Sequence, residues 1–166
     1  MPAEVLEVYT KELARRANPS ALHAVGQAAR MRIEEAREGI ARAVGAATSS
    51  EVIFTSGGTE ADNFALKGLY LARNGGTFTA PARPRVLTTT IEHPAIIETV
   101  EWLEAQGAEA VYLDVDSTGR LDLDAALTEL RRDPERTALI SVMAANNETG
   151  TLQPIAEIGE VAAELG

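Results

Sequence analysis

Residues 55–63, with the sequence TSGGTEADN, place two glycines and a threonine between an apolar run and a helical pattern. Glycine allows close approach to the backbone, and the first amide groups of a helix point outward without partners. A strand, a glycine turn and a helix start therefore form a site for an anion, with phosphate as the first candidate. The alternative is a plain helix start, with Thr59 as its cap and with Glu60 and Asp62 as acids that would repel phosphate. The local pattern leaves both interpretations open.

Two further polar segments offer groups for binding and proton transfer. Glu92 and His93 follow one apolar run, and Asn146, Asn147 and Glu148 follow another. An imidazole titrates near neutral pH, and a carboxamide both donates and accepts hydrogen bonds. The chain has no cysteine and only two histidines, which excludes a thiolate nucleophile and a histidine-rich metal site. We expect no metal site.

The composition excludes several classes of protein. The 166 residues are 45% hydrophobic and 24% charged, which is typical of a globular domain. The formal net charge of −10 argues against binding to nucleic acid or to an anionic membrane surface. No apolar stretch approaches the roughly 20 residues that a membrane span needs, and the N-terminus lacks the pattern of a signal peptide. We therefore expect a cytoplasmic protein.

Hydrophobic periodicity predicts the elements that must position these groups. Helices are expected over residues 3–16 and 25–44, the second ending at Gly45. Strands are then expected at 52–55, 85–90, 109–115 and 137–145, with a helix after each of them. This alternation predicts parallel pairing with right-handed crossovers, and thus an α/β fold with a mainly parallel sheet flanked by helices.

The polar segments all follow expected strands. Ligands of parallel sheets bind beyond the carboxyl ends of the strands. We therefore expect Thr59, His93 and Asn147 to converge at one edge of the sheet, although they lie far apart in the sequence. That edge would offer a phosphate cradle, an imidazole and a carboxamide.

Five segments resemble, in this order, the first half of the cysteine desulfurases, which are pyridoxal-phosphate enzymes of the class V aminotransferase superfamily. The segments read NPSALH, EVIFTSGGTEADN, TTIEHPAI, GRLDL and ISVMAANNETG. They extend over residues 18–150, and the NNETG segment resembles the iron–sulfur-assembly type. The resemblance implies part of the large domain of a fold-type I pyridoxal-phosphate transferase. Its N-terminal helices would occupy residues 1–45, and its alternating strands and helices residues 46–166.

The resemblance also implies roles for individual residues. Gly58 and Thr59 would hold the phosphate of pyridoxal 5′-phosphate, which favours the anion site over the plain helix start. His93 would stack on the pyridine ring and is a candidate acid–base group. Asn147 would form a hydrogen bond with the phenolic oxygen of the ring.

Several features of the family have no counterpart among these residues. The family begins with an additional strand, and it continues with an aspartate that pairs with the pyridine nitrogen, a Schiff-base lysine and a cysteine that accepts sulfur. Lys11 and Lys67 lie outside any segment that matches the lysine motif. We therefore expect an N-terminal part of such an enzyme, inactive by itself.

The resemblance also implies an order for the strands. Strand 86–89 should lie between 110–114 and 138–143. Segment 52–55 should be separated from these three by strands that the chain lacks, and should remain unsupported.

The implied reaction removes sulfur from L-cysteine and gives alanine and an enzyme persulfide, for iron–sulfur cluster assembly or another sulfur-transfer pathway. The family also implies a sulfur-acceptor or scaffold protein as a partner, and a homodimer for the full-length protein. Two alternatives remain open. One is another class V enzyme, such as a selenocysteine lyase or an aminotransferase, and the other is a non-catalytic phosphate-binding remnant.

Overall fold

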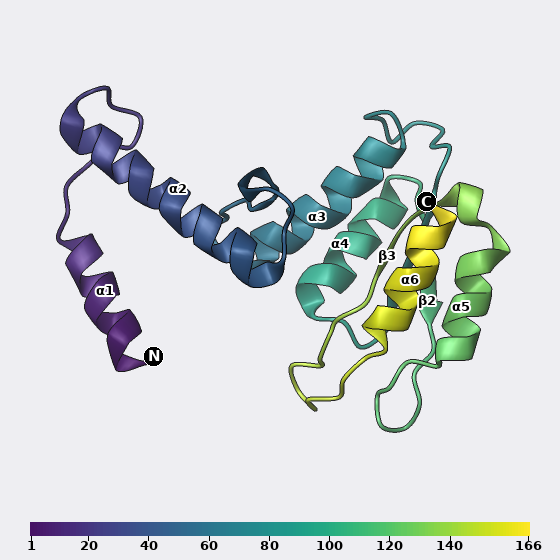
Figure 1. Cartoon of the computed structure of the whole chain (residues 1–166). Coiled ribbons are helices and arrows are strands. Elements are labelled where there is room, and N and C mark those ends of the chain that lie inside the picture. Colours follow the sequence, from purple (N-terminus) through teal and green to yellow (C-terminus); the bar gives the residue numbers. More distant parts are fainter. The chain divides into compact units, whose positions relative to one another are not determined.

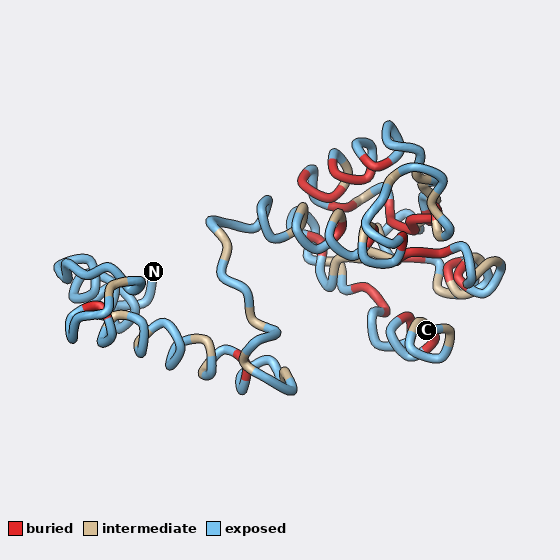
Figure 2. The backbone as a smooth tube through the Cα atoms, turned by 90° about the horizontal axis from the view of Figure 1, so that it is seen from above, coloured by how far each residue is buried: buried red, intermediate tan, exposed pale blue.

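The computed structural model describes all 166 residues and divides them into two compact units, Met1–Phe54 and Thr55–Gly166. Figure 1 shows their helices and strands. Buried residues are concentrated in the second unit, as Figure 2 shows. The sequence led us to expect N-terminal helices over residues 1–45 and alternating strands and helices over 46–166. That boundary separates kinds of element and not compact units, and it stays a prediction. No helix combines the length and the apolar character needed to cross a membrane.

The first unit consists of helices with little buried surface. Its elements are helix α1 (Ala3–Leu13), helix α2 (Ala24–Val44) and the short 3-10 helix η1 (Ser49–Glu51). Gly45 ends α2 as predicted, because its φ of 72° lies in the left-handed region that glycine adopts without strain. Only Gly26 and Ala41 are buried in this unit.

Residues 52–55 do not form the predicted strand. Val52 has extended backbone angles, with φ −92° and ψ 116°. However, the sheet contains only three strands, and this segment is not one of them. Ile53 and Phe54 are exposed. The apolar, β-branched pattern favours an extended backbone, but a strand also requires a hydrogen-bonded neighbour, and here there is none. The segment is unsupported, as the family resemblance implied.

The second unit contains the other predicted strands and helices. Its elements are α3 (Gly58–Arg73), β1 (Arg85–Thr89), α4 (Pro94–Ala105), β2 (Glu109–Leu113), α5 (Leu123–Arg132), η2 (Pro134–Arg136), β3 (Thr137–Ser141) and α6 (Ile155–Leu165). Pro94 occupies the first position of α4, where a missing amide hydrogen costs nothing. The Asp122 carboxylate caps α5 by accepting a hydrogen bond from the Ala125 amide at 3.0 Å.

The three strands form one parallel sheet in the order β2-β1-β3. Arg85 pairs with Glu109, and the register continues to the pair of Thr89 with Leu113. On the other side, Val86 of β1 pairs with Leu139 of β3. The predicted order, with β1 between the other two strands, is confirmed.

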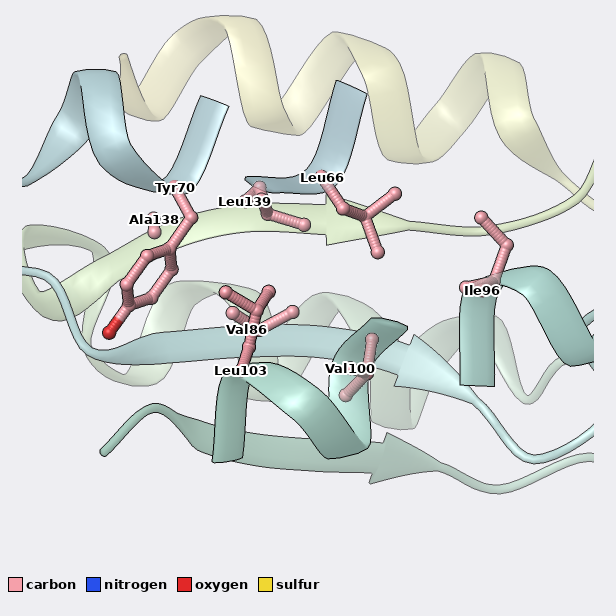
Figure 3. Close-up of a cluster of buried hydrophobic side chains, with 8 residues drawn as sticks. All are labelled: Leu66, Tyr70, Val86, Ile96, Val100, Leu103, Ala138 and Leu139. Atoms are coloured by element: carbon pink, nitrogen blue, oxygen red, sulfur yellow. The ribbon is translucent and has the colours of Figure 1, made fainter. Parts of the chain in front are cut away.

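Helices cover both faces of this sheet. Helices α3 and α4 pack on the face of Val86, and α5 and α6 pack on the face of Leu87, because successive side chains of a strand point to opposite faces. Figure 3 shows the cluster on the first face. It consists of Leu66, Tyr70, Val86, Ile96, Val100, Leu103, Ala138 and Leu139. The α/β architecture is thus confirmed, with a central sheet between two helical layers.

Loops follow all three strands at the carboxyl edge of the sheet. They comprise residues 90–93 after β1, 114–122 after β2 and 142–154 after β3. Figure 1 shows them together at the lower side of the view. This parallel arrangement brings three distant parts of the sequence to one edge.

Candidate functional site

The N-terminus of α3 offers free backbone donors. Gly57 is the N-cap residue, and no side chain caps the helix. The amides of Gly58, Thr59 and Glu60 donate no hydrogen bond within the chain, whereas the next amide, that of Ala61, already donates to Gly57. Thr59 lies inside the first turn, so the interpretation of Thr59 as a plain cap is wrong. Its hydroxyl makes no hydrogen bond within the chain.

The side-chain carboxylate of Glu60 does not bind these free backbone amides. Its carboxylate accepts hydrogen bonds from the Ser56 amide at 2.6 Å and from the Ser56 hydroxyl at 2.7 Å. These bonds lower the pKa of Glu60, so the side chain stays ionised while it closes the turn before the helix. A Cβ atom added at Gly57 or Gly58 would meet no atom within 4 Å. Open space therefore lies beside the glycines.

His93 is exposed at the start of α4, directly after the loop that follows β1. Its Nδ1 accepts a hydrogen bond from the Ala95 amide at 3.1 Å, and His93 is thereby the N-cap of the helix. In a neutral ring, this bond assigns the hydrogen to Nε2. The imidazole is therefore tethered at one nitrogen and can act as a donor at the other.

The preceding residue, Glu92, is a buried carboxyl group, and sequence reasoning named it beside His93 without assigning it a role. Only 8% of it is exposed. Its Oε1 accepts hydrogen bonds from the Thr89 hydroxyl at 2.8 Å and from the Met143 amide at 2.9 Å. Burial raises the pKa of Glu92, and the Asp62 carboxylate adds to this effect, while the two hydrogen bonds oppose it.

Asn146 and Asn147 have different environments. Asn146 is buried, and its Oδ1 accepts hydrogen bonds from the amides of Glu148 and Thr149, both at 2.9 Å. Its Nδ2 donates to the Ile91 carbonyl at 3.1 Å. Asn147 is exposed and donates only to the Glu148 carboxylate at 3.1 Å. Asn146 therefore forms the turn, and Asn147 is free to face a ligand.

The loop after β2 is joined to the loop after β3. The buried Gln153 accepts a hydrogen bond from the Leu121 amide at 2.8 Å and donates to the Gly119 carbonyl at 2.7 Å. The Thr151 hydroxyl donates to the Thr118 carbonyl at 2.8 Å. All three loops at the carboxyl edge are thus connected by side chains that bind backbone groups.

The predicted site residues can now be placed. His93 and Asn147 come from loops that are hydrogen-bonded to each other, so these two are brought to the same edge. Thr59 belongs to the first turn of α3. Asp62, three residues further along this helix, lies near enough to Glu92 to raise the pKa of the Glu92 carboxyl group. The assignment of ligand contacts to Gly58, Thr59, His93 and Asn147 stays a prediction.

Sequence comparisons relate the chain to known enzymes. Residues 1–166 match the aminotransferase class-V family. An IscS-like cysteine desulfurase of Mycobacterium tuberculosis (strain ATCC 25618 / H37Rv) is 49% identical over 150 residues, which are 90% of this chain and 37% of that protein. The cysteine desulfurase IscS of Dictyoglomus turgidum is 44% identical over 161 residues, which are 97% of this chain and 38% of that protein. The chain thus spans a little over a third of the length of these curated relatives.

Solved structures agree with these relatives. A NifS-like protein superposes with a TM-score of 0.86 at 34% identity, covering 100% of this chain and 43% of that one. A structure described as SspA in complex with cysteine gives a TM-score of 0.85 at 35% identity, covering 99% of this chain and 45% of that one. From the match over its whole length and these likenesses, the chain belongs to the aminotransferase class V family.

Proposed function

We propose that the protein acts as a cysteine desulfurase that depends on pyridoxal 5′-phosphate. It would remove the sulfur of L-cysteine, giving alanine and a persulfide on an enzyme cysteine. The observation that carries this proposal is the 49% identity, over 90% of the chain, to a protein named as a cysteine desulfurase. The chain's own geometry is consistent with the cofactor, as its donor groups indicate.

The N-terminus of α3 suits the phosphate group of the cofactor. The unpaired amides of Gly58, Thr59 and Glu60 and the free Thr59 hydroxyl are hydrogen-bond donors, which is what phosphate oxygens accept. The open space beside Gly57 leaves room for the anion. We infer that Gly58 and Thr59 bind the phosphate.

His93 and Asn147 suit the ring of the cofactor. When bound, pyridoxal 5′-phosphate supplies an electron sink for the α-carbon of the substrate. The His93 imidazole, tethered at Nδ1, would lie against the ring and exchange a proton at Nε2. The exposed Asn147 carboxamide would donate a hydrogen bond to the phenolic oxygen.

Other groups that the reaction needs are not found among these residues. The chain contains no cysteine, so it does not supply the thiol that takes the sulfur. The ammonium group of Lys67 on α3 lies 4.2 Å from the centre of the Trp102 ring on α4, in a cation–π contact. We therefore infer that neither Lys67 nor Lys11 forms the Schiff base, and that the 166 residues are inactive by themselves.

Further parts of the proposal rest on the family resemblance. We propose a homodimeric, cytoplasmic enzyme that passes sulfur to an acceptor or scaffold protein for iron–sulfur cluster assembly. Contacts with nucleic acid or a membrane are not expected at a net charge of −10. The names of the relatives favour desulfurase activity over another class V activity, such as that of a selenocysteine lyase or an aminotransferase.

A binding experiment tests the phosphate assignment. Thr59→Ala should weaken binding of pyridoxine 5′-phosphate, which has no aldehyde, by roughly 10- to 100-fold, because a hydrogen bond to a charged group contributes about 1.5–3 kcal/mol. Thr128→Ala, on the exposed surface of α5, is the matched control and should leave the affinity unchanged. Equal affinities for the two variants would contradict the phosphate assignment.

An activity experiment tests the reaction. A chimera in which residues 1–166 replace the matching region of the Mycobacterium tuberculosis relative should convert L-cysteine to alanine and persulfide sulfur. Turnover of selenocysteine alone, or amino-group transfer without sulfur release, would support another class V activity. Cofactor binding without any turnover would support a non-catalytic remnant.

A further inference from the structure

We propose that Glu92 and Asn146 are positioning residues, which clamp the loop of His93 to the loop of Asn147. This inference rests on the proposed function, because it assigns the clamp the task of holding those two side chains at a ring between them. Neither Glu92 nor Asn146 is proposed to touch the ring.

The clamp consists of two hydrogen bonds between the loops, and in both of them the loop after β3 supplies the donor and the loop after β1 the acceptor. Glu92, in the loop after β1, accepts a hydrogen bond from the Met143 amide in the loop after β3 at 2.9 Å. Asn146, in the loop after β3, donates to the Ile91 carbonyl in the loop after β1 at 3.1 Å. Each loop thus contributes one side chain and one backbone group. Two such bonds fix both the separation and the relative rotation of the loops.

The same order of residues occurs in both loops. Glu92 and Asn146 are buried, with 8% and 9% of each residue exposed. The residue directly after each of them, His93 or Asn147, is exposed. A buried anchor is therefore followed by an exposed polar side chain twice, in the loops that follow two neighbouring strands. This repetition indicates that the anchors determine where the exposed side chains are placed.

Each anchor is also fixed within its own loop. The Thr89 hydroxyl donates to the same Glu92 oxygen that binds the Met143 amide. Asn146 closes its own turn by accepting from the amides of Glu148 and Thr149. The clamp therefore joins two locally ordered loops, and breaking it should change their relative position rather than unfold either loop.

Such a clamp matters for binding at the ring, because a misplacement of about 1 Å in a positioned group lowers the efficiency of a site strongly. It does not matter for the phosphate, since the donors of Gly58 and Thr59 belong to the start of α3 and not to either loop. The two parts of one ligand can therefore be used to separate the effects.

The test compares two probes on the 166-residue chain, inorganic phosphate and pyridoxine 5′-phosphate. Glu92→Ala removes one crossing bond, and Asn146→Asp keeps the turn acceptor but removes the amide donor of the other. Glu92→Gln retains an acceptor oxygen at the same position and serves as the conservative rescue. Glu98→Ala, on the exposed surface of α4, is the matched control.

We expect Glu92→Ala and Asn146→Asp each to weaken binding of pyridoxine 5′-phosphate roughly 10-fold and that of inorganic phosphate less than about 2-fold. Glu92→Gln and Glu98→Ala should stay within about 2-fold of the parent chain. The affinity of the double variant for pyridoxine 5′-phosphate should fall by much less than the product of the two single fold losses, because both bonds hold the same pair of loops. Equal losses for both probes, or no loss for either, would overturn the clamp.

Hydrogen exchange gives a readout that needs no variant. In the unsubstituted chain, the Met143 amide should exchange at least roughly 100-fold more slowly than the Asn147 amide, because only the former donates to a buried acceptor. Rapid exchange at Met143 overturns the clamp, even if the alanine variant does not fold. If the unsubstituted chain binds neither probe but protects Met143, the proposed function fails and the loop clamp stands.

Discussion

Thr88 carries a hydroxyl group that the core of the second unit leaves without a partner. Its side chain is fully buried near the end of β1, and its Oγ1 makes no hydrogen bond. Thr88→Val replaces this hydroxyl by a methyl group of similar size. An unsatisfied buried hydroxyl costs about 1–3 kcal/mol, and the added methyl group contributes about 0.8 kcal/mol when buried. Because the denatured chain already buries part of the methyl surface, the second contribution is somewhat smaller, and we expect the free energy of unfolding to rise by about 1.5–3.5 kcal/mol.

Urea unfolding monitored by tryptophan fluorescence measures this change. Trp102 is the only tryptophan, and its ring packs edge-on against Phe78 with 5.3 Å between the ring centres. Phe78 in turn contacts the cluster that contains Val86, on the same face of the sheet as Thr88. With a denaturant slope of about 2 kcal/mol per molar urea, the middle of the usual range, the midpoint should rise by roughly 0.7–1.8 M.

Thr137→Val is the matched control in β3. Thr137 is also a buried strand residue, but its hydroxyl donates to the Asp133 carbonyl at 2.9 Å and accepts from the Arg85 guanidinium at 3.2 Å. Its replacement should lower the free energy of unfolding by about 1–3 kcal/mol. If Thr88→Val lowers the midpoint as well, the Thr88 hydroxyl has a partner and the reasoning is refuted.

Three further predictions concern other parts of the chain. Gly26→Ala should disrupt the turn before α2, because its Cβ would lie 2.4 Å from a backbone carbonyl oxygen of that turn; limited proteolysis between α1 and α2 should accelerate, and an unchanged rate would contradict this. Burial raises the pKa of Glu92 above the ordinary 4.5, so the folded chain holds this proton more tightly and its stability falls as pH rises through the folded pKa. As pH rises from about 4.5 to about 7, the Glu92→Gln variant should therefore lose less free energy of unfolding, measured in urea, than the parent chain. Equal losses in the variant and the parent chain would exclude the effect. Borohydride reduction with pyridoxal 5′-phosphate should leave both lysines without stoichiometric label in mass spectrometry, since Lys67 is engaged with Trp102 and Lys11 lies on α1; full labelling of either would contradict the inferred inactivity.

Local patterns predicted most elements of the fold. The hydrophobic periodicity and the helix-breaking residues predicted α4, with Pro94 at its first position, because these signals depend only on residues that are neighbours in the sequence. The failure at 52–55 has a different origin, since that segment has the composition of a strand but no hydrogen-bonded neighbour. Composition reports what a residue prefers, and pairing depends on which other segments are present.

The site was predictable to a lesser extent. The carboxyl-edge rule brought His93 and Asn147 to one edge correctly, because strand direction follows from the alternation of elements. The roles of Glu92 and Asn146 could not be derived, since they depend on bonds to backbone groups about 50 residues away. Thr59 was considered as a cap, but the helix starts two residues earlier, with Gly57 as its N-cap, and this leaves the Thr59 hydroxyl free.

The hydrogen bonds between the loops at the carboxyl edge involve two kinds of position, which should differ in how well they tolerate substitution. Glu92, Asn146 and Gln153 use specific side-chain atoms, whereas the groups that they bind at Met143 and Ile91 belong to the backbone. Any residue other than proline supplies an amide hydrogen, and every residue supplies a carbonyl oxygen. The positions that present backbone groups can therefore change side chain without loss of these bonds, and so can adapt the rim to different substrates while its geometry is retained.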